Sequence, residues 1–228
     1  MFDALFTTTT EYKKLSHALS GKGACALFGL PASGRAQVYA ALCRQLDKPL
    51  CIVTPGEAEA TRFAADLNTL GIPAAVFPAR DYVLRPIEGT AREYEYRRLA
   101  VLGELVGGRL RAVAVPAEAL TQFTTPKEDF CANTRTLHAG DTLLRDDLLA
   151  ALFGAGYTRR AQVDGPGQFS VRGDIVDIFA PDQKMPVRME FWGDEIDTLH
   201  TFDLTTQRRE DAIDKFYLSP CLLYTSDA

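Results

Sequence analysis

The chain has 228 residues, of which 46% are apolar and 24% are charged, and its formal net charge is -5 at pH 7. This composition predicts a globular protein with one large domain or two ordinary ones. The mild negative charge argues against tight, salt-driven binding of nucleic acid. The first residues lack the basic start and apolar core of a signal peptide, and no apolar run could span a membrane. We therefore expect a cytoplasmic protein without membrane contacts.

The cysteines lie far apart, with no C-x-x-C pair and no neighbouring histidine pattern. Neither a zinc site nor a disulfide framework is indicated, and we expect isolated buried thiols and no metal. The five cysteines are Cys25, Cys43, Cys51, Cys131 and Cys221.

The first half of the chain alternates short apolar runs with helical patterns. The expected strands are Ala24–Gly29, Leu50–Thr54, Ala74–Phe77 and Ala112–Val115, and the expected helices are Arg35–Leu46, Glu57–Leu70 and Ala91–Val106. Strands that are apolar throughout and separated by helices are typical of a parallel sheet covered on both faces. We therefore predict an α/β domain.

The turn after the first predicted strand reads GLPASGRA, and Gly29 and Gly34 have the G-x-x-x-x-G spacing of a P-loop. A working loop continues with lysine, which reaches the phosphates, and with Ser or Thr, which holds magnesium. Arg35 and Ala36 stand at those positions, and alanine has no oxygen to ligate a metal. The loop is thus either a degenerate P-loop without hydrolytic activity or an ordinary glycine-rich turn, and its spacing alone favours neither.

A segment rich in arginine and tyrosine spans residues 78–102. Its arginines could contact a phosphate backbone, with aromatic rings stacking on bases. Interleaved acidic residues favour instead a solvated, salt-bridged helix face. The side chains concerned are Arg80, Arg85, Arg92, Arg97 and Arg98, the tyrosines Tyr82, Tyr94 and Tyr96, and the acids Asp81, Glu88, Glu93 and Glu95.

The second half of the chain differs in kind. The alternation of strands and helices stops near Thr124, where polar residues and Pro126 indicate a domain boundary. The pattern then predicts a strand over 134–137, a helix over 145–153 ending at Gly154, a strand over 157–163, and at least three more strands between 165 and 203. These elements predict an α+β domain with a mainly antiparallel sheet.

The strand expected over 186–192 has two distinct faces. Val187, Met189 and Phe191 fall on one face because side chains alternate along a strand. The opposite face carries Arg188, Glu190 and Trp192, so an arginine and an aromatic side chain should point outward together. A local interpretation pairs Glu190 with Arg188 and stacks Arg188 on Trp192.

The stretches VDGPGQFSVRGDIVDIFAP and PVRMEFWGDEIDTLHTFDLTTQR resemble a segment shared by transcription-repair coupling factors and the excision repair protein UvrB. In this family a smaller α+β domain is inserted into a RecA-like P-loop domain. Arg35 and Ala36 resemble the corresponding residues of the coupling factors, in which the amino-terminal loop is degenerate. Asp174 instead resembles the residue that UvrB has at this position.

The resemblance implies a function without catalysis and without a cofactor in this chain. Its smaller domain would dock on UvrA through Arg172, Arg188 and Trp192. A complete coupling factor would also bind RNA polymerase and double-stranded DNA, and would use ATP and magnesium in translocase domains that lie outside this chain. The alternatives are a UvrB-type ATPase that acts on damaged DNA and a nucleic-acid-binding module.

The expected domain limits follow from the same resemblance. Residues 1–123 would be the first part of the degenerate P-loop domain, 124–210 the UvrA-interaction domain, and 211–220 the start of a return to the first domain. The last eight residues, CLLYTSDA, resemble a translated sequencing adapter, so 221–228 is interpreted as a non-native tail on a fragment.

Overall fold

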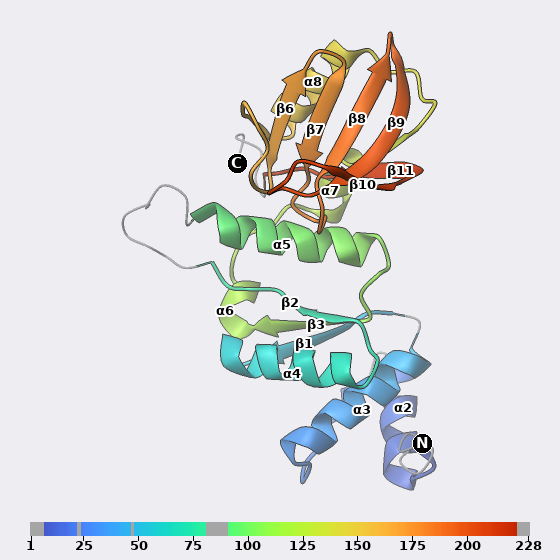
Figure 1. Ribbon diagram of the computed structural model, residues 1–228. Helices are drawn as coiled ribbons and strands as arrows, with labels where there is room; N and C mark the ends of the chain where they lie inside the picture. The colour runs from blue at the N-terminus through green and yellow to red at the C-terminus, as the bar shows by residue number, and fades with distance from the viewer. Residues whose placement is uncertain (1–6, 22–23, 47, 81–90, 223–228) are drawn as a thin grey trace. The chain divides into compact units, whose positions relative to one another are not determined.

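The structure is a computed structural model, and it describes residues 7–21, 24–46, 48–80 and 91–222 (Figure 1). The chain divides into two compact units. The first comprises Met1–Ala79 and Gly107–Thr121, and the second comprises Arg80–Val106 and Gln122–Ala228. The helix predicted over 91–106 thus groups with the second unit, although the sequence-based limits assign it to the first domain.

The first unit contains a small parallel sheet with the strand order β1-β3-β2. Its strands are β1 (Leu50–Thr54), β2 (Ala74–Val76) and β3 (Ala112–Pro116), and its helices are α2 (Thr10–Ser20), α3 (Ala32–Gln45), α4 (Glu57–Thr69) and α6 (Ala117–Leu120). Helices α3 and α4 share one core, in which Ala36 and Ala40 pack with Ala60 and Phe63. The predicted parallel α/β arrangement is confirmed for these three strands.

The strand predicted over 24–29 is wrong. Residues 24–28 form no strand and lie exposed, with Phe28 88% accessible. An apolar run becomes a strand only where another backbone pairs with it, and none of the described residues pairs with this one. Helix α3 begins earlier than expected, at Ala32. Pro31 is its N-cap residue, and the Pro31 carbonyl accepts the first helical hydrogen bond, from the Arg35 N–H at 3.0 Å.

The second unit is built around a six-stranded sheet with the order β10-β9-β8-β7-β6-β5. Its strands are β5 (Thr158–Arg159), β6 (Gln168–Arg172), β7 (Ile175–Phe179), β8 (Val187–Trp192), β9 (Glu195–Phe202) and β10 (Arg209–Ala212). All neighbours are antiparallel except β5 and β6. The mainly antiparallel sheet is confirmed, although the strand expected over 157–163 is only two residues long.

Two tight turns set the register of this sheet. Gly173 joins β6 to β7 and Gly193 joins β8 to β9, with φ angles of 60° and 63°, and each is followed by an aspartate. Such positive φ angles at the first turn position suit glycine and match the twist of antiparallel strands. The Gly-Asp pairs of the sequence are therefore hairpin turns.

The remaining elements of the second unit surround its core. They are α5 (Ala91–Val106), α7 (Lys127–Ala132), α8 (Arg145–Gly154) and the antiparallel pair β4 (Arg135–His138) and β11 (Lys215–Leu218). Helix α8 lies on one face of the six-stranded sheet (Figure 1). Its residues Leu148 and Leu152 are buried in one core with Phe169, Ile178 and Met189. Helix α8 begins at Arg145, as predicted.

The arginine-rich segment is only partly described. Arg97 pairs with Glu93 at 3.0 Å and Arg80 with Glu95 at 3.6 Å, as a salt-bridged face requires. Arg98 is instead buried and donates to the Gln122 side chain at 2.8 Å. The predictions made for Asp81, Tyr82, Arg85 and Glu88 lie outside the described residues, as does the side chain of Arg92.

The expectation that all cysteines are buried is wrong for three of them. Cys43 and Cys221 are buried, but Cys25, Cys51 and Cys131 are exposed. Cys25 lies in the unpaired segment before α3, and Cys51 belongs to β1, whose side chains alternate between buried and exposed. The exposure of Cys25 and Cys51 thus follows from the lack of a strand pairing at 24–28 and from the position of β1 at the rim of its sheet, whereas Cys131 lies on the exposed side of α7.

Candidate partner-docking surface

The large sheet of the second unit has one core face and one outer face. Val187, Met189 and Phe191 lie in the core, as the alternation in β8 predicts. The neighbouring strands continue both faces because their residues are paired directly across the sheet. The outer face carries Ser170 and Arg172 of β6, Ile175 and Asp177 of β7, and Arg188, Glu190 and Trp192 of β8.

Trp192 is the most exposed large side chain of this face. It lies at the end of β8, beside the Gly193 turn, and 82% of its surface is accessible. Its neighbour Phe191 points the other way and is only 6% exposed. The outward orientation predicted for Trp192 is therefore confirmed, and the ring is available for contact with another molecule.

Arg188 belongs to the outer face but is not exposed, which corrects the expectation of an outward side chain. Its Nε and Nη2 atoms donate to Asp177 Oδ1 and Oδ2 at 2.7 and 3.0 Å. Its Nη1 donates to the Gln207 carbonyl at 3.1 Å, and its guanidinium lies 4.7 Å from the centre of the Phe202 ring. The chain that follows β9 thus covers Arg188, and only 10% of its side chain is accessible.

The local interpretation of this strand is also wrong. Glu190 does not pair with Arg188, because it accepts hydrogen bonds from Arg209 and, at 3.3 Å, from the Thr198 hydroxyl. The ring that contacts Arg188 belongs to Phe202 and not to Trp192. Trp192 is therefore an exposed side chain that does not stack on Arg188.

Asp177 joins the two predicted arginines. Arg172 Nη2 donates to Asp177 Oδ2 at 2.6 Å, so a single buried carboxylate receives hydrogen bonds from both Arg172 and Arg188. Asp177 is fully buried, whereas 48% of the Arg172 side chain is accessible. Sequence reasoning missed Asp177, although the alternation in IVDIF places it on the outer face of β7.

The loop that covers Arg188 is held by its own polar groups. The Asp203 carboxylate accepts from the Thr206 N–H at 2.7 Å, from the Thr206 hydroxyl at 2.8 Å and from the Thr205 N–H at 3.1 Å. These bonds lower the pKa of Asp203, chiefly the one from the Thr206 N–H. The motif FDLTTQ thus encodes a compact turn that places the Gln207 carbonyl on Arg188.

The glycine-rich loop of the first unit does not have the side-chain arrangement of a phosphate-binding loop. Gly29 has a φ of 82°, but Gly34 lies inside the first turn of α3. Arg35 reaches across to α4, where its Nη1 lies 3.8 Å from Glu59 and its guanidinium 5.7 Å from the Phe63 ring centre. Ala36 is 2% exposed and packs in the core. Neither side chain is arranged to hold a phosphate or a metal.

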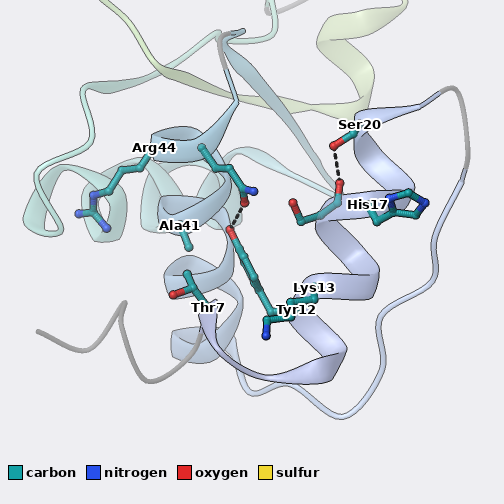
Figure 2. Close-up of a pocket in the computed structure, with 9 residues that line it drawn as sticks. Thr7, Tyr12, Lys13, His17, Ser20, Ala41 and Arg44 are labelled. Atoms are coloured by element: carbon teal, nitrogen blue, oxygen red, sulfur yellow. Dashed lines mark hydrogen bonds between the residues drawn. The ribbon is translucent and has the colours of Figure 1, made fainter.

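A pocket of about 490 Å³ lies between α2 and α3, lined in part by Tyr12, Lys13, His17 and Arg44 (Figure 2). Its polar groups do not converge on a ligand position. The Tyr12 hydroxyl donates to Gln45 at 3.0 Å, and Figure 2 shows the His17 and Arg44 side chains extending in opposite directions. We therefore do not assign it a ligand.

Within the residues that the structure describes, no group of three or more His, Cys, Asp or Glu side chains could hold a metal ion. Among the helices of the described ranges, none has the length and apolar character needed to cross a membrane.

Comparison with known proteins shows what this sheet is similar to. Residues 136–224, which lie within the second unit, match the family model of the UvrB interaction domain. The match extends into the segment interpreted as a tail, where Cys221 is 2% exposed and its N–H donates to the Ala155 carbonyl at 2.8 Å.

The chain as a whole is similar to transcription-repair-coupling factors. It is 38% identical over 192 residues to the one from Mycobacterium tuberculosis, covering 81% of this chain and 15% of that protein. It is 28% identical over 196 residues to the one from Bacillus subtilis, covering 85% and 17%. UvrABC system protein B of Burkholderia pseudomallei is 29% identical over 216 residues, covering 88% and 31%. The resemblance found in the sequence is confirmed, and the chain spans less than a third of the length of these relatives.

Proposed function

We propose that this chain is a non-catalytic module that recruits UvrA, and that it belongs to a transcription-repair coupling factor linking stalled RNA polymerase to nucleotide excision repair. The observation that carries the proposal is Trp192, which is 82% exposed on the outer face of a UvrB interaction domain. Aromatic and arginine side chains dominate the energetics of protein interfaces, because they combine a large contact area with directional polar groups. Arg172 supplies the second accessible group of this surface.

Catalysis is not part of the proposed function. Arg35 is engaged with Glu59 and Phe63, and Ala36 is buried and has no oxygen for magnesium. The loop thus fits the interpretation as a degenerate P-loop of a RecA-like domain. ATP and magnesium, together with contacts to RNA polymerase and double-stranded DNA, would belong to regions of the coupling factors that this chain does not span. The proposed site of action is the cytoplasm.

The test is a binding measurement between the purified chain and UvrA. We expect Trp192→Ala to weaken binding by about tenfold or more, as truncation of an interface hot spot does. Phe28→Ala is the matched control, because Phe28 is also highly exposed, at 88%, but lies in the first unit. Equal affinity of the Trp192 variant and the unsubstituted chain would contradict the proposal.

A UvrB-type ATPase is the second candidate, favoured by the similarity to UvrABC system protein B over 88% of the chain. It predicts nucleotide turnover that depends on the glycine-rich loop. We expect no turnover above the background of the buffer. ATP hydrolysis that disappears in the Arg35→Ala variant would favour this candidate over the recruiting module.

A further inference from the structure

We propose that Asp177 is a positioning residue of the docking surface, which fixes the Arg172 guanidinium so that it can receive an acidic side chain of the partner. Asp177 is fully buried, and both of its oxygens accept hydrogen bonds from arginine. This inference rests on the proposed function, because it concerns how the same surface recognises UvrA.

The charges of this cluster do not cancel. One carboxylate faces two guanidinium groups, so the three side chains carry a net charge of about +1 when all are ionised. Arg188 is almost fully covered, and its remaining nitrogen donates to the Gln207 carbonyl. The surplus positive charge is therefore presented at Arg172, which is half accessible.

Arg172 also has further N–H groups with which it can donate hydrogen bonds to a partner. A guanidinium carries five N–H groups in a planar fork, which matches a carboxylate in two parallel hydrogen bonds. Among the described residues, Arg172 makes one side-chain hydrogen bond, the one from Nη2 to Asp177. That bond restricts the rotation of a long side chain before the partner arrives, which lowers the entropy that binding must remove.

The positions of Arg172 and Trp192 define the partner further. Both lie at the same end of the outer face, on β6 and β8, with β7 between them. Two strand spacings separate β6 from β8 by roughly 10 Å, and Trp192 lies two residues beyond Glu190, the residue level with Arg172, so the backbones at Arg172 and Trp192 are about 12 Å apart. Two acidic side chains of this face lie near Trp192: Glu190 is paired with Arg209, and the exposed Glu195 is the cross-strand neighbour of Trp192. The surface thus fits a partner that presents a carboxylate at about that distance from an apolar recess for the indole ring.

A double-mutant cycle on the full chain tests this role. The background variant combines Asp177→Asn with Arg188→Gln, which removes both buried charges together and avoids leaving either one unpaired. In the natural background we expect Arg172→Ala to weaken UvrA binding by about tenfold. In the background variant we expect the same substitution to cost less than about twofold, because Arg172 is no longer held in place.

If the role of Asp177 were purely structural, the background substitutions would change the folding stability and would leave the contribution of Arg172 to UvrA binding unaltered. A tenfold cost of Arg172→Ala in both backgrounds would therefore overturn the inference while leaving the proposed function intact, provided that Trp192→Ala still weakens binding. Absence of UvrA binding by the unsubstituted chain would overturn the proposed function and this inference together.

A second variant keeps the inference testable if the background variant does not fold. Arg172→Lys retains the charge but lacks the fork that can contact Asp177 and a partner carboxylate at once. We expect Arg172→Lys to bind UvrA nearly as weakly as Arg172→Ala. Full affinity of the lysine variant would mean that a mobile point charge suffices, and would overturn the positioning role of Asp177.

Discussion

The Gln207 carbonyl accepts a hydrogen bond from Arg188 Nη1 at 3.1 Å although Gln207 has a φ of 58°, in the left-handed region that favours glycine. Its N–H donates to the Asp203 carbonyl at 2.8 Å, and its side chain donates to the Leu204 carbonyl at 2.8 Å. A disfavoured backbone conformation is thus retained at the residue that covers the buried arginine of the docking surface.

Gln207 therefore offers a direct test of backbone strain. Gln207→Ala removes the side-chain hydrogen bonds to the Leu204 and Val163 carbonyls and keeps a Cβ at positive φ, so we expect the free energy of unfolding to fall by about 1–2 kcal/mol. Gln207→Gly loses the same two bonds but relieves the strain, and should be more stable than the alanine variant by about 0.5–1 kcal/mol. Urea unfolding of both variants measures the difference. An alanine variant as stable as the glycine variant would show that no strain is present.

Trp192 and its neighbour Phe191 should respond oppositely to truncation. Trp192→Ala removes an exposed side chain, and we expect the free energy of unfolding to change by less than about 0.5 kcal/mol. Phe191→Ala opens a cavity in the core and should cost about 3–5 kcal/mol. Urea unfolding distinguishes the two. A large loss of stability in the Trp192 variant would mean that the indole ring supports the fold and is not free for a partner.

Trp192 is the one tryptophan of the chain, so its fluorescence reports on this surface alone. With 82% of the residue accessible, acrylamide should quench the emission of the folded chain nearly as efficiently as that of the chain unfolded in urea. Free tryptophan amide provides the reference for full exposure. Strong protection of the folded chain from quenching would contradict the exposed position of the ring.

The turn after β9 should weaken in acid. The hydrogen bonds from Thr206, and then from Thr205, lower the pKa of Asp203 in the folded state below its ordinary value. A lowered folded pKa contributes stability that is present above the unfolded pKa, near 4, and is lost as the pH falls through the folded pKa. We therefore expect Asp203→Asn to be less stable than the natural chain at neutral pH.

This stability difference should narrow as the pH falls below about 4, because protonation then removes the same charge from the natural chain. Urea unfolding of both chains across that range provides the measurement, and the interval from about pH 6 to pH 8, where Asp203 stays ionised, provides the control. A constant difference down to about pH 3 would contradict the role assigned to the ionised carboxylate.

Restoring a hydroxyl to the glycine-rich loop should disturb the packing of the first unit. Ala36 is 2% exposed in the core shared by α3 and α4, so Ala36→Thr introduces extra volume and a buried hydroxyl. We expect a loss of about 1–3 kcal/mol in the free energy of unfolding. Gln37→Thr on the exposed side of α3 is the control for the lower helix propensity of threonine. Equal stability of the two variants would mean that the loop can accept the residue of a working P-loop.

The sheet of the second unit could be predicted closely, because two local signals agree there. Alternation of apolar and polar residues predicts the faces of β8, and the Gly-Asp pairs predict the turns that join its neighbours. The burial of Arg188 could not be predicted in this way. It depends on Asp177 in the neighbouring strand and on Gln207 in a later loop, and no local pattern relates these three positions.

The segment before α3 is a place where the local sequence pattern predicts the wrong structure. Residues 24–28 have the apolar composition of a buried strand, yet they pair with none of the described residues. Strand formation depends on a partner backbone, which local composition does not specify. Ala36 is a related case. The sequence indicates only that alanine lacks the hydroxyl group that would ligate a metal, whereas the structure shows Ala36 packed in the core shared by two helices.

The rims of the six-stranded sheet restrict how another protein can attach. One rim is β10, a four-residue strand with every residue exposed, acidic and basic side chains, and an irregular register against β9. The other rim is β5, which contributes only two residues. Short, charged and irregular rims discourage the addition of a foreign strand. Recognition by this unit would therefore depend on a few face side chains and not on a continuous backbone ladder, so that single substitutions could abolish it and leave the fold intact.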